Sequence, residues 1–131
     1  MKTAWLVCVI ALGGSALACN PFGPDQSTVL STITIDAPTS VAAGATFTVT
    51  LTVQTGGCLT FDRIDVQPNA TGATLVPWGK DASIGRTDIT CTQENRLEQH
   101  AVQLNAGSSD PFYVDVDRGS LSPLRATVRV Q

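Results

Sequence analysis

Residues 46–53, TFTVTLTV, constrain the fold of this 131-residue chain more than any other stretch. Every second residue is apolar, and the residues between them are all threonine. Side chains alternate between the two faces of a β-strand, whereas a helix would spread these apolar residues around its whole surface. The stretch therefore predicts a half-buried strand. The residues expected to face the core are Phe47, Val49, Leu51 and Val53.

The same two-residue period recurs in other short segments, and no segment has helical periodicity. Residues rich in glycine, proline, serine and asparagine separate these segments, as at turns. About seven short strands with turn signals between them predict an all-β chain folded as a single antiparallel sandwich. In the first segment, the residues expected on the inner face are Val29, Ile33 and Ile35.

Two of the predicted strands contain an irregularity. The apolar residues of 58–66 change parity between Phe61 and Ile64, and this change predicts a bulge near Asp62-Arg63. Proline has no backbone N–H and is confined to strand edges, strand ends or bulges. Pro77 is therefore expected at an edge or an end.

The first 18 residues have the pattern of an export signal. Lys2 supplies the positive start, residues 4–12 are apolar, and small residues follow. The whole apolar run is about 16 residues, shorter than the roughly 20 needed to span a bilayer. Cleavage after Ala18 is expected, because Ala16-Leu17-Ala18 is an A-x-A site for the ordinary signal peptidase.

The stretch Ala16-Leu17-Ala18-Cys19 also resembles the lipobox of bacterial lipoproteins. That family usually has leucine three residues before the cysteine and a small residue two before it, and here Ala16 and Leu17 hold these positions in the reverse order. In that family the cysteine thiol is diacylated and the preceding bond is then cut. The resemblance implies lipidation of Cys19, with acyl chains that anchor the protein to the bacterial cell membrane or outer envelope. Two or three chains give stable attachment where a single chain is marginal.

The cysteine count favours the same interpretation. Cys8 leaves with the signal, so an odd number of cysteines remains in an exported chain. Lipidation of Cys19 leaves Cys58 and Cys91 to pair as a disulfide in an oxidising compartment. A free or intermolecular thiol at Cys19 is the alternative. The sequence of 20–27, NPFGPDQS, is typical of a flexible tether, which makes 19–27 a lipidated cysteine and spacer.

The remaining residues, 28–131, resemble the immunoglobulin-like domains of bacterial surface and envelope proteins. Those domains often have a Pro-x-x-Val-x-x-Gly opening before their second strand, and Pro38, Val41 and Gly44 match it. The resemblance implies one immunoglobulin-like β-sandwich. It implies no particular activity.

Few residues have a pattern that points to chemistry. His100 is the only histidine, and it has neither a second metal ligand nor a G-x-S-x-G motif nearby. We therefore expect no catalytic residue, no metal and no cofactor, and we place His100 at the margin of a sheet. The residues proposed as a partner-contact loop are Trp78, Lys80, Asp81 and Arg86. Burial of Trp78 at the end of the core is the alternative.

Two acidic residues, Asp115 and Asp117, alternate with apolar neighbours and are expected on the solvated face of a strand. Arg125 and Arg129 alternate in the same way on the following predicted strand. We expect the two kinds of charge to pair across the strands.

The charge balance excludes one class of partner. Without Lys2 the chain has seven Lys and Arg against eleven Asp and Glu, which argues against nucleic acid. The sequence therefore predicts a lipid-anchored cell-envelope protein with a non-enzymatic binding or structural role. Its partner would be an envelope protein or a glycan. The alternative is a secreted immunoglobulin-like protease inhibitor, or a soluble binding module released by ordinary signal peptidase.

Overall fold

The computed structural model describes residues 26–131, which contain nine strands and no helix. The all-β class is therefore confirmed. The predicted signal, Cys19 and residues 20–25 lie outside the described residues. The strands are β1 (Ser27–Val29), β2 (Thr32–Asp36), β3 (Ser40–Val41), β4 (Thr46–Thr55), β5 (Leu59–Asn69), β6 (Gly72–Asp81), β7 (Arg96–Asn105), β8 (Phe112–Arg118) and β9 (Leu121–Val130). Residues 26–131 include no helical segment that could cross a membrane.

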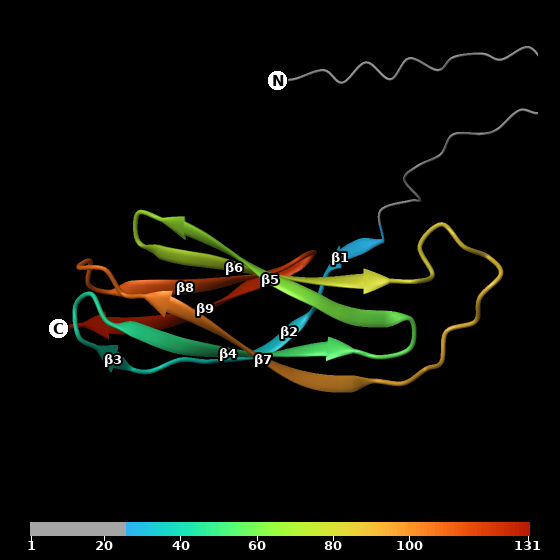
Figure 1. Ribbon diagram of the computed structural model, residues 1–131, viewed down its shortest axis with the longest axis horizontal. Helices are drawn as coiled ribbons and strands as arrows, with labels where there is room; N and C mark the ends of the chain where they lie inside the picture. Colours follow the sequence, from blue (N-terminus) through green and yellow to red (C-terminus); the bar gives the residue numbers. More distant parts are fainter. Residues whose placement is uncertain (1–25) are drawn as a thin grey trace, which may run out of the picture.

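The strands form two sheets, which lie as two layers in Figure 1. The three-stranded sheet has the order β2-β4-β7. In the six-stranded sheet, β6 pairs with β5 on one side and with both β1 and β8 on the other, and β9 and β3 follow β8.

The expectation of purely antiparallel sheets is wrong at two pairings. β3 runs parallel to β9, and β6 runs parallel to β8. The second pairing arises because the β5–β6 hairpin places β6, and not β5, beside β8. The two strands of a hairpin run in opposite directions, so the choice of neighbour decides the direction of the pairing.

The core lies between the two sheets. All four core residues predicted for β4 are buried, with 0 to 6% of their surface exposed. The buried residues that β6, β8 and β9 contribute include Leu75, Val114, Val116 and Val128. At one end of the core, the rings of Phe47 and Phe112 meet edge to face with their centroids 5.6 Å apart.

The inner face predicted for the first strand is wrong at Ile33, whereas Ile35 packs against the core as expected. Ile33 is 47% exposed, whereas Thr32 is fully buried. The pairing of β2 with β4 shifts register between Thr32 and Thr34, and this bulge turns Ile33 outward. Leu30 is fully buried and packs tightly against Gly79. A Cβ added to Gly79 would lie 2.3 Å from the Cδ2 atom of Leu30.

The bulge predicted in β5 is confirmed, because the register with β6 shifts between Phe61 and Arg63. The position expected for Pro77 is wrong, because Pro77 is buried within β6. Its carbonyl accepts a hydrogen bond from the Leu30 N–H at 2.8 Å, so its backbone faces the side where β6 changes partner. Pairing with β8 ends at Leu75, and pairing with β1 begins at Trp78. The absent N–H of Pro77 falls between the two partners, where neither ladder needs a donor.

Candidate functional site

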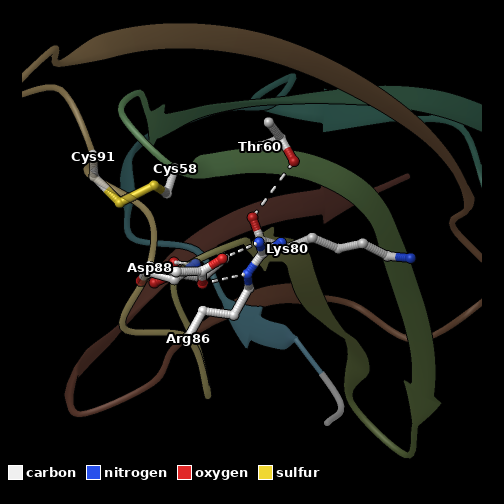
Figure 2. Close-up of a disulfide and its surroundings, with 8 residues drawn as sticks. Cys58, Thr60, Lys80, Arg86, Asp88 and Cys91 are labelled. Atoms are coloured by element: carbon white, nitrogen blue, oxygen red, sulfur yellow. Dashed lines mark hydrogen bonds and ion pairs between the residues drawn. A yellow bond between two sulfur atoms is a disulfide. The ribbon is translucent and has the colours of Figure 1, made fainter. Parts of the chain in front are cut away.

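Cys58 and Cys91 form a disulfide, with their Cα atoms 5.2 Å apart (Figure 2). The bond joins the turn after β4 to the 82–95 segment, which contains no strand. Backbone contacts reinforce it, because an added Cβ on Gly57 would lie 2.5 Å from the Thr92 carbonyl oxygen. The disulfide and these contacts hold a long loop against the end of both sheets.

The four residues predicted as a contact loop do not form one cluster. Trp78, Lys80 and Asp81 belong to β6, and only Arg86 lies in the loop. Asp81 accepts a hydrogen bond from the Ser83 N–H, and Arg86 pairs with Asp88 at 2.9 Å, as Figure 2 shows for the second pair. Within residues 26–131, no hydrogen bond or ion pair joins two of the four.

Trp78 is neither an exposed anchor nor a plug at the end of the core. It is half-buried on β6, on the face opposite Leu75 and Gly79. The Arg63 guanidinium lies over its ring, with the Cζ atom 5.6 Å from the ring centroid. Hydrogen bonds to Asp65 and then Asp62 raise the pKa of Arg63 above its ordinary value and hold the guanidinium in place beside Trp78.

His100 lies at a sheet margin, as predicted, on β7 at the end of the three-stranded sheet. Its ring stacks on Phe61 of the other sheet, with the two ring centroids 3.5 Å apart. Its Nε2 atom lies 3.2 Å from a Glu98 carboxylate oxygen. Across the described range, 26–131, no three His, Cys, Asp or Glu residues are placed to hold a metal ion.

A surface groove of about 570 Å³ lies where β6, β8 and β9 run side by side. Its position follows from the register, because Asp115 of β8 lies opposite Thr74 of β6 and opposite Arg125 of β9. The residues that line the groove are Thr74, Asp115, Val116, Asp117, Pro123 and Arg125.

The charged groups of the groove are held in place by their neighbours. Arg125 donates from Nε and Nη2 to the two carboxylate oxygens of Asp115, at 2.6 and 2.9 Å. These bonds raise the pKa of Arg125, and its guanidinium also lies 4.5 Å from the centroid of the Tyr113 ring. Asp117 accepts a hydrogen bond from the Gly119 N–H at 2.8 Å. A ligand would therefore meet donors and acceptors that are already oriented.

Half of the expected cross-strand pairing is confirmed. Asp115 pairs with Arg125, but Arg129 pairs with Asp110 at 3.0 Å instead of with Asp117. The register explains the difference, because Arg129 lies at the end of β9 that is next to the start of β8. Asp117 lies at the opposite end of β8, beside the turn.

Thr74 and Pro123 are groove residues that the sequence reasoning did not single out. Thr74 has the parity of a solvated strand position, which is the one local signal for its placement. Its contact with Asp115 depends on the parallel pairing of β6 with β8, and no local pattern indicates that pairing.

The fold and the site together define an all-β, two-sheet domain with a disulfide-held loop and a surface groove that includes charged side chains. Comparison of the chain with protein-family models, with curated proteins and with solved structures finds no match.

Proposed function

We propose that the protein is a lipid-anchored cell-envelope protein whose immunoglobulin-like sandwich binds a partner without catalysing a reaction. The observation that carries the binding role is the groove on the outer face of β6, β8 and β9, with its pre-oriented Asp115–Arg125 pair. The anchor rests on the export signal and the lipobox-like Ala16-Leu17-Ala18-Cys19 sequence.

The way the chain enters the domain supports this arrangement. The carbonyl of Gln26 accepts a hydrogen bond from the Asp81 N–H, and the Ala82 N–H donates to the Cys58 carbonyl. The tether therefore joins the domain at the end that carries the disulfide. Six residues, 20–25, lie between Cys19 and this point, and they reach at most about 22 Å when fully extended. In an anchored protein, that end faces the membrane and the groove lies on the side of the domain.

The groove fits a hydroxyl-rich glycan. Carboxylate oxygens of Asp115 and Asp117 accept hydrogen bonds, the Arg125 guanidinium donates them, and the Thr74 hydroxyl does both. Neighbouring sugar hydroxyls need donors and acceptors side by side. Pro123 adds apolar surface for the carbon face of a sugar ring.

The anchor is tested by mass spectrometry of the mature N-terminus, with and without globomycin. We expect an acylated Cys19, and we expect the Cys19→Ser variant to move from the membrane fraction to the soluble fraction. An unmodified Cys19 in the exported wild-type protein would contradict the anchor and favour ordinary secretion.

The groove is tested by binding of the purified protein to an array of bacterial cell-surface glycans. Asp117→Asn and Arg125→Ala each remove a hydrogen-bonding charge, and each is expected to weaken binding about tenfold or more. Arg129→Ala is the matched control, because Arg129 lies on the same strand outside the groove and should bind within about twofold of the wild type. Equal loss in all three variants, or no binding by the wild-type protein, would overturn the glycan proposal.

A further inference from the structure

Among the strands of residues 26–131, the two long strands β5 and β7 pair on one side only. Unpaired edges attract other strands, and proteins protect them with bulges, prolines and charges. The β5 edge has a bulge after Phe61, and Pro68 lies near its end. β7 contains no proline and pairs with β4 at all ten positions without a register shift, and its two charged residues, Arg96 and Glu98, lie near its first end. β7 is therefore the long edge that is open to a further strand.

The phase of the ladder shows which backbone groups β7 presents. The Ala106 N–H donates to the Ala45 carbonyl, so even-numbered residues of this strand direct their N–H and C=O groups toward β4. The N–H and C=O groups of the odd-numbered residues 97, 99, 101 and 103 point away from the sheet. A second strand could bond to these groups without disturbing the first ladder.

The sequence of β7 is complementary to itself when two copies run antiparallel with Gln99 opposite Gln99. Leu97 then lies opposite Ala101 of the second copy. The second copy thereby covers the Leu97 side chain, which is 62% exposed in the single chain. On the inner face, Glu98 lies opposite His100, an acid opposite a base, at a close non-hydrogen-bonded pair. Centring the pair on Ala101 would instead place Glu98 opposite the buried, apolar Leu104.

We propose that β7 is a homodimerisation edge, where two copies of this chain pair antiparallel about Gln99. The three-stranded sheets of the two copies then form one continuous sheet, and the interface is isologous, as in most dimers. This inference does not depend on the anchor or on the groove.

The test is cysteine cross-linking of the full chain in the exporting cell, read on non-reducing gels. Gln99→Cys is expected to give a disulfide-linked dimer, because the two residues 99 face each other across the two-fold axis within disulfide reach. Ala101→Cys and Gln103→Cys are the matched controls, because their partners would lie roughly 14 and 27 Å away along the strands. Neither control is expected to cross-link.

Each other outcome overturns the proposal. A dimer with Ala101→Cys alone would mean a different register, and equal cross-linking of all three variants would mean random collision. A cross-linked band with the mass of another protein would show that a different partner occupies the edge. The absence of any band would mean that the edge stays open.

A second measurement uses sedimentation of the exported chain carrying Cys19→Ser. Gln99→Pro removes an N–H that points away from β4, so the domain should keep its β-sheet circular dichroism while the dimer dissociates. We expect the dissociation constant of the dimer to be at least about tenfold higher than that of the Cys19→Ser parent. A folded Gln99→Pro variant that dimerises as tightly as its parent would contradict the interface.

Discussion

At the scale of single residues, Asp81 shows how a strand end is held. The N–H and the hydroxyl of Ser83 both donate to the same oxygen of Asp81, and these hydrogen bonds lower the pKa of Asp81 below 3.8. Because the folded pKa is depressed, the bonds contribute stability that is fully present above about pH 5, where the carboxyl of the unfolded chain is also ionised. That contribution is lost as the pH falls through the folded pKa.

Ser83→Ala removes one of the two donors, so the pKa of Asp81 is expected to rise toward its ordinary value. At pH 7 the free energy of unfolding should fall by no more than about 1.5 kcal/mol, and the difference from the wild type should shrink below about pH 3. NMR titration of the Asp81 carboxyl and urea unfolding at both pH values check this. Ser120→Ala, in an exposed turn, is the control and should change neither quantity. A difference that grows at low pH would contradict the assignment.

Residue-scale features differ in how far the sequence reveals them. The β4 alternation was readable because four successive inner positions, from Phe47 to Val53, are all apolar. The exposure of Ile33 was not readable, because a buried polar Thr32 occupies the inner position and hides the change of parity. Isoleucine usually prefers burial, so its local sequence signals the wrong face.

At the scale of elements, the 82–95 loop depends on the disulfide more than on its own burial. Most of its residues are exposed, and its contact with the end of β4 runs through backbone at Gly56 and Gly57. An added Cβ on Gly56 would lie 2.1 Å from the Glu94 carbonyl oxygen. The glycines permit this approach, and the Cys58–Cys91 bond keeps it in place.

Replacing both cysteines with alanine is expected to lower the free energy of unfolding by roughly 3–4 kcal/mol, since the bond closes a loop of 33 residues in the unfolded chain. Urea unfolding measures this effect. Hydrogen exchange should show faster exchange confined to the loop, with the β4–β7 ladder still protected. Equal stability of the variant and the oxidised wild type would show that the backbone contacts suffice alone.

The bulge in β5 and the parallel pairing of β6 with β8 show what element-scale prediction needs. In β5, apolar residues on both sides of Asp62 change parity openly, so the extra residue was found from the sequence. The parallel neighbours β6 and β8 could not be found in this way, because 36 residues separate Leu75 from Phe112 and no periodicity records which strand lies beside which.

At the scale of the whole molecule, one core joins the two sheets. Leu51 of the three-stranded sheet and Leu75 of the six-stranded sheet are both fully buried in it. If either sheet separated from the other, the apolar side chains of this core would be exposed to water. Unfolding is therefore expected to be a single cooperative transition.

Leu51→Ala is expected to lower the free energy of unfolding by about 2–5 kcal/mol, through lost burial and the cavity that remains. Circular dichroism and tryptophan fluorescence should report the same midpoint in urea. Leu121→Ala is the control, because Leu121 is 48% exposed and its loss should change the free energy by less than about 0.5 kcal/mol. Two separate transitions in the Leu51→Ala variant would contradict a shared core.

The sequence by itself determined the all-β class, the residues of β4 that face the core, the bulge in β5 and the pairing of Cys58 with Cys91. Each depends on local periodicity or on a count of one residue type, and both can be read directly from the amino-acid sequence. Only the tertiary structure decided the parallel pairings, the burial of Pro77 and the groove beside Asp115. Those features depend on which distant strands become neighbours, and that choice is made by burial of the whole core rather than by any single segment.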